Sequence, residues 1–291
     1  MIPSLKGCAK RGVGPKMAEK DFFKQLDLEH KCREIRRLIL STACHAGCGH
    51  TGGSLSCVEI LAALYLNCMK IDPKNPSWNE RDRFVLSKGH CTLAYYSVLA
   101  LKGYFPPEEL DTFDKVDSRL QGHPDMRKLP GVDMSTGSLG QGISVGIGMA
   151  LGLKWKNMAG HVFVLVGDGE LQEGQNWEAF MFAGHRNIGN ITVIIDNNKL
   201  QLSGRVDELL SLEPLEEKIS SFKWNVFRSD GHDIAQLVSS INTAKSDNMP
   251  SVIIADTNKG KGYSRAELNV AWHGLAPSKE ELNEALKELG Y

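Results

Sequence analysis

Asp168 stands at the end of an apolar run, between two glycines, in the segment VFVLVGDG. The apolar run is typical of a buried strand, and the residues that follow have a helical pattern. In a parallel α/β sheet, ligands bind outside the carboxyl ends of the strands. Glycines at such a strand end let backbone N–H groups approach an anion, and the N-terminus of the next helix favours phosphate. The segment therefore predicts a phosphate-binding corner that also carries a carboxylate.

A carboxylate and a phosphate repel each other unless a cation lies between them. Mg²⁺ meets this need, because it is held by one or two protein oxygens together with phosphate oxygens. A second strand pattern, ITVIID, leads to Asn198, thirty positions after Asp168. With one helical pattern between them, the two strand ends are expected to be neighbours. We therefore expect Mg²⁺, or another divalent cation such as Ca²⁺ or Mn²⁺, on Asp168, the Asn198 amide oxygen and the Leu200 carbonyl.

The elements that must position these residues follow from hydrophobic periodicity. Apolar strand patterns alternate with helical patterns, which predicts an α/β fold with a parallel sheet and helices on both faces. The expected strands are HVFVLV, NITVIID, WNVFRS and SVIIAD. The expected helices cover 28–44, 58–66, 92–102, a stretch from about Leu139, 175–186, 234–245 and a last helix that stops at Gly290.

Two further patterns concern helix starts and helix packing. Ser56 with Glu59, and Ser278 with Glu281, have the spacing of a capping box. The helix near Leu139 contains four glycines, each of which weakens an exposed helix by roughly 1 kcal/mol. We expect these glycines to pack closely against a neighbour; they are Gly142, Gly146, Gly148 and Gly152.

Length and composition bound the possible functions. The 291 residues are expected to form a flexible tail over 1–18 and a single domain over 19–291. A net charge of −1 gives no electrostatic case for nucleic acid or an anionic membrane as partner. No apolar run reaches the roughly 18 residues that span a bilayer. Seven cysteines scattered through helical patterns favour reduced thiols and a cytoplasmic location.

Several motifs together resemble transketolase, a family of thiamin-diphosphate enzymes. GDG followed about thirty residues later by NN resembles the signature of thiamin-diphosphate enzymes in general. The remaining motifs resemble those of transketolase in particular. The motifs are GHTGGS, RDRFVLSKGH, QGHPD, STGSLGQG, GDGELQEG and WHGLAP. They occur in the family's order and cover almost everything from residue 28 onward. The resemblance is to the N-terminal, diphosphate-binding portion, and it implies the thiamin-diphosphate-binding fold with thiamin diphosphate as cofactor.

The same resemblance implies roles for four of the nine histidines. His50 would lie by the reacting end of the substrate, and His90 against the cofactor diphosphate and the substrate. His123 would contact the donor's hydroxyl and carbonyl region, and His273 would reach both diphosphate and substrate. An unperturbed pKa near 6.5 suits histidine for the proton transfers involved. The other histidines match no motif and are expected on the surface or in packing; they are His30, His45, His161, His185 and His232.

Further cofactor contacts are implied by the remaining motifs. Lys259, in NKGKG, would lie near the diphosphate, with a solvated loop lysine as the alternative. Glu173 would help to connect paired cofactor sites across a dimer, or would be a carboxylate favoured at a helix start. The cofactor-binding set is completed by Gly137, Ser138, Leu139 and Gly169, together with His90, Asn198 and His273.

The resemblance also implies a reaction and a partner. Transketolase transfers a two-carbon ketol unit from a ketose phosphate to an aldose phosphate. Its cofactor is activated by a glutamate of the second portion, so we expect a partner chain, the C-terminal transketolase subunit with the pyrimidine-binding and C-terminal domains, in an α₂β₂ assembly. The alternatives are a 1-deoxyxylulose-5-phosphate synthase-like subunit, which lacks the SKGH and GHPD pattern, and a non-catalytic cofactor-binding module. Xylulose 5-phosphate is the default donor, with a branched or sulfonated ketose left open.

Overall fold

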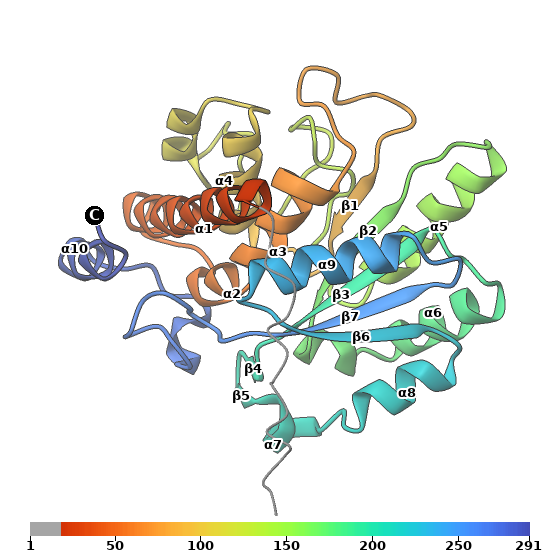
Figure 1. Cartoon of the computed structure of the whole chain (residues 1–291). Coiled ribbons are helices and arrows are strands. Elements are labelled where there is room, and N and C mark those ends of the chain that lie inside the picture. Colours follow the sequence, from red (N-terminus) through yellow and green to blue (C-terminus); the bar gives the residue numbers. More distant parts are fainter. Residues whose placement is uncertain (1–18) are drawn as a thin grey trace, which may run out of the picture.

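A five-stranded parallel sheet forms the centre of the molecule (Figure 1). The structure is a computed structural model that describes residues 19–291, so the predicted tail over 1–18 lies outside the described residues. The strand order is β1-β2-β3-β7-β6. The strands are β1 (Arg83–Leu86), β2 (Val162–Gly167), β3 (Ile191–Asn197), β7 (Ser251–Asp256) and β6 (Asn225–Asp230), and β4 (Leu200–Gln201) pairs with β5 (Gly204–Arg205) in a small hairpin.

Helices cover both faces of the sheet, so the predicted α/β fold is confirmed (Figure 1). Successive residues of β3 serve different cores: Ile194 packs on one face, whereas Val193 and Ile195 pack on the other. One face carries α1 (Glu19–Ala46), α3 (Val58–Ala63), α4 (Thr92–Lys102) and α9 (Ile234–Lys245), and the other carries α5 (Gly142–Trp155), α6 (Gly174–His185) and α8 (Leu215–Ser221). The remaining α-helices are α2 (Thr51–Ser56), α7 (Val206–Leu210) and α10 (Lys279–Glu288).

One of the two predicted capping boxes is confirmed and the other is wrong. Ser278 and Glu281 form a capping box at the start of α10. Ser56 instead ends α2, and its hydroxyl donates 2.6 Å to the buried carboxylate of Asp196. Glu59 binds the guanidinium of Arg36. Both side chains are therefore engaged by charged partners distant in sequence, and α3 begins without a side-chain cap.

The glycines of α5 divide into two pairs. A Cβ at Gly142 would overlap Ser87, and one at Gly146 would overlap Val164, so these two positions pack as expected. A Cβ at Gly148 or Gly152 would meet nothing within 4 Å. The expectation of close packing is therefore wrong for this second pair, which faces outward.

Some elements differ from the sequence-based expectations. Strand β1 lies inside the motif RDRFVLSKGH and was not predicted, since its four residues follow charged side chains and make too short an apolar run. Helix α5 begins at Gly142 rather than near Leu139, and α1 extends beyond both predicted ends. Among residues 19–291, no helix has both the length and the apolar character needed to cross a bilayer. The six cysteines of this range are all free thiols.

Candidate functional site

The two polar strand ends predicted to meet do lie side by side. Strands β2 and β3 pair in register, with Gly167 opposite Asp196, so Asp168 and Asn198 follow neighbouring strand ends. The carboxylate of Asp168 accepts the backbone N–H of Lys199 at 2.6 Å. The parallel sheet thus places a carboxylate and an amide group together at the carboxyl-terminal ends of two adjacent strands, as the motif spacing predicted.

The chemistry of these atoms suits a hard cation. Asp168 is buried, and burial, together with the negative charge of Asp196, raises its pKa to about 6. A cation beside Asp168 would favour the charged carboxylate and so lower this raised pKa. The Asn198 amide oxygen and the Leu200 carbonyl are further oxygen donors of the kind that Mg²⁺ and Ca²⁺ take. Within residues 19–291 no group of three or more His, Cys, Asp or Glu side chains could hold a metal, so an ion here depends on these mixed oxygens.

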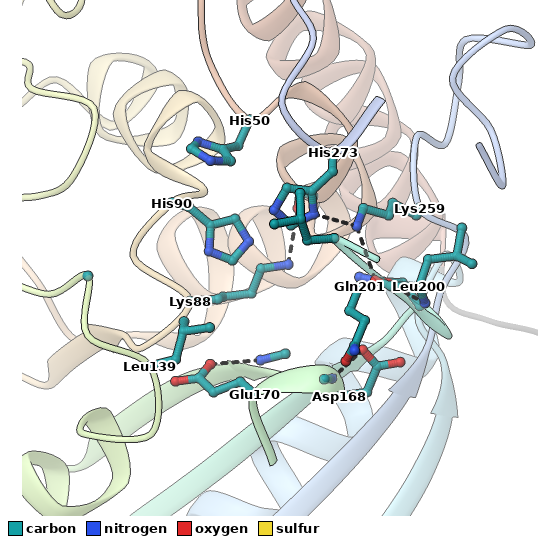
Figure 2. A pocket seen from close by; sticks show the side chains of 16 residues that line it. His50, Lys88, His90, Leu139, Asp168, Glu170, Leu200, Gln201, Lys259 and His273 are labelled. Carbon is teal, nitrogen blue, oxygen red and sulfur yellow. Dashed lines mark hydrogen bonds between the residues drawn. The ribbon is translucent and has the colours of Figure 1, made fainter. Parts of the chain in front are cut away.

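A cavity of about 310 Å³ opens beside this corner (Figure 2). Most of the residues predicted for the site line it. They are His50, His90, Gly137, Leu139, Asp168, Gly169, Asn198, Leu200, Lys259 and His273.

Four histidines predicted from separate motifs lie close together, and three of them, His50, His90 and His273, line this cavity. The ring centroid of His50 lies 5.1 Å from that of His90, 5.5 Å from that of His273 and 6.1 Å from that of His123. The rings of His90 and His273 stack at 5.3 Å. His123 lines a second cavity of about 530 Å³, which also has His50 in its wall. His50 therefore stands between the two cavities.

Burial and nearby positive charge lower the pKa of three of these imidazoles, which favours their neutral form. The pKa of His50 and that of His123 are lowered, first by burial and then by the charge of His90. The pKa of His273 falls to about 3, because of burial and the nearby ammonium of Lys259. A neutral imidazole has one nitrogen that donates and one that accepts, which suits it to hold or move a proton.

Lys259 is a buried residue of the cavity wall, so the alternative of a solvated loop lysine is wrong. It is 2% exposed. Its ammonium donates to the Leu200 carbonyl at 3.1 Å and lies 2.8 Å from Nδ1 of His273 (Figure 2). Burial and the charge of Lys88 lower its pKa to about 8. A positive charge thus faces the space beside the Gly-Asp-Gly corner.

Two predicted residues, Ser138 and Glu173, line neither cavity. Ser138 is exposed, between two residues that line the cavity. Glu173 is exposed at the start of α6, where its side chain makes no capping hydrogen bond. Its position agrees with the helix-start alternative, and its predicted role across a dimer stays a prediction.

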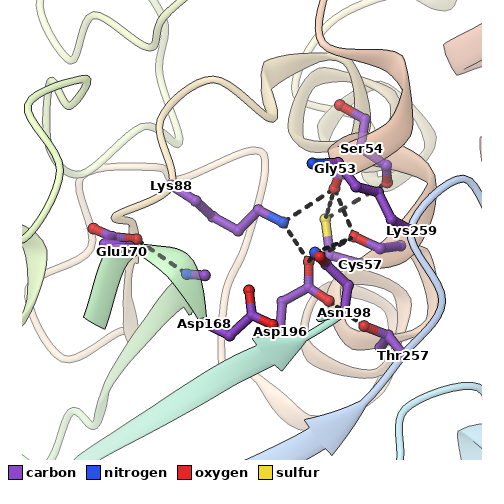
Figure 3. A network of polar contacts seen from close by, with 12 residues as sticks. Gly53, Ser54, Cys57, Lys88, Asp168, Glu170, Asp196, Asn198, Thr257 and Lys259 are labelled. Atoms are coloured by element: carbon purple, nitrogen blue, oxygen red, sulfur yellow. Dashed lines mark hydrogen bonds and ion pairs between the residues drawn. The ribbon is translucent and has the colours of Figure 1, made fainter. Parts of the chain in front are cut away.

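Sequence reasoning missed a buried ion pair between Lys88 and Asp196 (Figure 3). The Lys88 ammonium also donates to the Gly53 carbonyl at 3.1 Å, and Lys88 lines the cavity. Asp196 accepts from Asn198 Nδ2 at 3.1 Å, which directs the Asn198 oxygen the other way. Further donors to Asp196 are the hydroxyls of Ser56 and Thr257. Lys88 comes two positions after the apolar run FVL and Asp196 directly after ITVII, so a charged residue near the end of an apolar run could have indicated each residue, although not that the two form a pair.

Glu170, in the same Gly-Asp-Gly-Glu segment, was also missed. It is buried, and burial raises its pKa, although hydrogen bonds oppose the shift. Its carboxylate accepts the backbone N–H of Gly140 at 2.9 Å and that of Gly167 at 3.0 Å. Glu170 therefore joins the corner after β2 to the loop that precedes α5.

The five histidines outside the motifs lie where the sequence predicted. His161 is buried and bonds Thr192 at 2.9 Å, and His232 bonds Glu59 at 3.0 Å. His30, His45 and His185 are exposed.

Comparison with known proteins agrees with this arrangement. The family model described as "Transketolase, thiamine diphosphate binding domain" matches residues 29–291. The 6-deoxy-6-sulfo-D-fructose transketolase subunit SqwG of Clostridium sp. (strain MSTE9) is 48% identical over 266 residues, which cover 91% of this chain and 97% of that protein. An apulose-4-phosphate transketolase subunit of Actinobacillus succinogenes is 42% identical over 265 residues, which cover 90% of this chain and 96% of that protein.

Comparison with a solved structure also indicates the transketolase fold. The crystal structure of transketolase from Campylobacter jejuni is similar with a TM-score of 0.83 and 31% identity, over 91% of this chain and 42% of that one. The chain belongs to the transketolase family and corresponds to its thiamin-diphosphate-binding portion. The resemblance predicted from the motifs, to the N-terminal subunit of a two-chain transketolase, is confirmed, since the chain spans nearly the whole of two relatives that are named as subunits.

Proposed function

We propose that this chain is the diphosphate-binding subunit of an enzyme that transfers a two-carbon ketol unit from a ketose phosphate to an aldose phosphate. One observation carries the proposal: the Gly-Asp-Gly corner shares one cavity with His50, His90 and His273, which come from separate motifs. We further propose residues 19–291 as a single domain and the cytoplasm as its location.

The corner would hold the cofactor's diphosphate through a divalent cation. Asp168, the Asn198 amide oxygen and the Leu200 carbonyl would be the protein ligands of that cation. When bound, thiamin diphosphate supplies the electron sink that this reaction class requires. The Lys259 ammonium, which now rests on the Leu200 carbonyl, would offer its charge to the diphosphate. Backbone groups of Gly137, Ser138, Leu139 and Gly169 would complete the contacts.

The histidines would act on the substrate. Neutral imidazoles at His50 and His123 flank the second cavity, where hydroxyl groups of a sugar would find both donors and acceptors. His90 and His273 stand between that region and the corner, so they would contact diphosphate and substrate together. The group's role is to orient hydroxyls and to move protons at the reacting end.

A partner chain is part of the proposal. Both subunits compared above are matched over nearly their whole length, whereas this chain covers only 42% of the transketolase of Rattus norvegicus. Two leucines that line the cavity are exposed, Leu139 at 36% and Leu202 at 67%, and Leu275, two positions after His273, is 48% exposed. Apolar side chains in such positions favour burial against another protein. For that protein we propose the C-terminal transketolase subunit, in an α₂β₂ assembly, with Glu173 at the contact between paired sites.

The test is reconstitution. The purified chain should give no ketol transfer, and activity should appear when the partner subunit, thiamin diphosphate and Mg²⁺ are added. Donors to compare are xylulose 5-phosphate, 6-deoxy-6-sulfofructose and apulose 4-phosphate, since two relatives are named for the latter two. Robust turnover by the chain alone, free of host transketolase, would contradict the two-chain proposal. Cofactor binding without turnover on any donor, with the partner present, would favour a non-catalytic module.

A further inference from the structure

The segment that carries Lys259 into the cavity is held on both sides of that residue. One position before it, the backbone N–H of Asn258 donates to Nε2 of His232 at 2.8 Å. Two positions after it, the carbonyl of Lys261 accepts from Nε of Arg36 at 2.9 Å. Neither His232 nor Arg36 lines the cavity. The segment after β7 is therefore fixed from behind, by residues of α1 and of the turn before α9.

Both contacts converge on one carboxylate, that of Glu59 in α3. Arg36 donates to it through two nitrogens, at 2.7 and 2.9 Å. Nδ1 of His232 lies 3.0 Å from Oε2 of Glu59. Because Nε2 of His232 accepts the backbone N–H of Asn258, the proton of a neutral ring lies on Nδ1, which donates to Glu59. Glu59 thus sets the orientation of both the guanidinium and the imidazole.

Burial and charge pairing stabilise the contacts that Glu59 makes with Arg36 and His232. Glu59 is 7% exposed and Arg36 is 6% exposed. Burial raises the pKa of Glu59, but the charge of Arg36 and hydrogen bonds from His232 and Arg36 outweigh it and lower the pKa to about 2. Paired, charge-assisted hydrogen bonds of this kind are among the strongest in proteins. Gly262 lies against the Arg36 side chain, since a Cβ there would come within 2.6 Å of Cδ.

We propose that Glu59 is a positioning residue for Lys259. Through Arg36 and His232 it holds the segment after β7 in the conformation that places the Lys259 ammonium on the Leu200 carbonyl and beside His273. Loss of the carboxylate weakens both contacts at once, so the segment, although Gly260 still donates to the Gly52 carbonyl at 3.0 Å, opens more often and exposes the lysine. The positioning stands on this geometry alone, whereas its consequence for cofactor affinity rests on the proposed function.

Amine labelling tests the positioning without any ligand. The full chain is treated with acetic anhydride, and acetylation at Lys259 and Lys88 is read by mass spectrometry. Both lysines are 2% exposed, but Lys88 is held by Asp196 and serves as the internal control. In Glu59→Gln, labelling of Lys259 should rise roughly tenfold through local opening, with Lys88 unchanged.

The His232 variants form a matched pair that does not disturb the carboxylate. His232→Ala removes the acceptor of the Asn258 N–H and should also expose Lys259. His232→Gln keeps an acceptor at the place of Nε2 but loses the Nδ1 contact with Glu59, so its labelling should lie between that of the wild type and that of His232→Ala. Equal increases at Lys88 and Lys259, or no increase in Glu59→Gln and His232→Ala, would overturn the proposal. If Glu59→Gln does not fold, Glu59→Asp, which withdraws the carboxylate by one methylene group, takes its place with the same expected rise at Lys259.

A second measurement separates this inference from the proposed function. In the enzyme assembled with its partner, Glu59→Gln should weaken the affinity for thiamin diphosphate roughly 10–100-fold, as loss of an outer supporting contact does, with turnover at saturating cofactor preserved. In a Lys259→Met background the same substitution should add little, because both changes act through one residue. Fully additive effects would overturn the coupling. Increased labelling without a change in affinity would leave the positioning intact and refute the diphosphate role of Lys259.

Discussion

Lys88 and Asp196 form an ion pair that solvent hardly reaches, with side chains 2% and 0% exposed. A buried pair depends on both partners, since removal of one leaves an uncompensated charge. Burial lowers the pKa of Lys88, but the charge of Asp196 outweighs it and raises the pKa well above its usual value. The pair also fixes the amide of Asn198 through Asp196. It is therefore both a structural element and part of the cavity wall.

We predict that Lys88→Met destabilises the fold by roughly 3–5 kcal/mol, because Asp196 stays buried without its cation. The double variant Lys88→Met/Asp196→Asn should lose less than the single one, since no charge is then stranded. Urea unfolding of the two variants measures the difference. A double variant less stable than Lys88→Met would show that the charge pairing is not the cause.

Asp168→Asn should remove Mg²⁺-dependent cofactor binding. The amide keeps an acceptor for a backbone N–H but lacks the charge that offsets a divalent cation. We expect the affinity for thiamin diphosphate in the presence of Mg²⁺ to fall by roughly two orders of magnitude or more, comparable with loss of a metal-site contact. Titration calorimetry of the assembled enzyme with and without Mg²⁺ measures it. Unchanged affinity, or metal-independent binding by the wild type, would contradict the cation site.

His123→Ala and His273→Ala should lower turnover by roughly 10²–10⁴-fold, the usual worth of a proton-transfer group. Thermal stability should change little, because neither side chain belongs to the apolar core. His30→Ala, at an exposed position, is the matched control and should leave turnover unchanged. A large fall in melting temperature with near-normal turnover would make the two histidines structural.

Two glycines of α5 offer a direct test of packing. Gly148→Ala should stabilise the free chain by up to about 1 kcal/mol, since the new methyl group enters open space and the helix gains propensity. Gly146→Ala should destabilise it by roughly 1–3 kcal/mol through overlap with Val164. Unfolding of both variants measures the contrast. Equal effects would show that the helix adjusts its position.

Stability should fall with acidity through His161. Burial lowers its folded-state pKa to about 4, with Asp82 opposing the shift, whereas the unfolded value is 6.5. The unfolded chain therefore binds the proton more tightly, and the stability present above pH 6.5 is lost as the pH falls towards 4 by at most about 1.4 kcal/mol per unit. His161→Gln, which can still bond Thr192, should reduce this slope in urea unfolding between pH 7.5 and 5. Identical slopes would refute the assignment.

The sequence predicted the strand-end chemistry because parallel order brings carboxyl ends together whatever lies between them. Two strand patterns with one helical pattern between them were enough to predict that Asp168 and Asn198 lie close together. Lys88 and Asp196 lie 108 positions apart, and no local pattern indicates such a pair. The same holds for Glu59 and His232, 173 positions apart, whose side chains meet only because α3 and the turn before α9 pack together.

The resemblance to transketolase, rather than periodicity, predicted the four histidines. Spacing along the chain gives no reason for His50 and His273 to share a cavity, whereas the family's motif order does. The predicted roles of Glu173 and Ser138 could not be checked against the cavity in the same way. Both are exposed and line neither cavity, so their predicted roles stay predictions.

The strand order has a consequence for synthesis of the chain. Strand β7 lies between β3 and β6, although it is made after both. Until it emerges from the ribosome, the apolar edge of β3 has no neighbour on that side and β6 has nothing to pair with. An open, apolar strand edge is prone to aggregation. Nascent chains stalled before Ser251 should therefore recruit chaperones, and those extended beyond it should not.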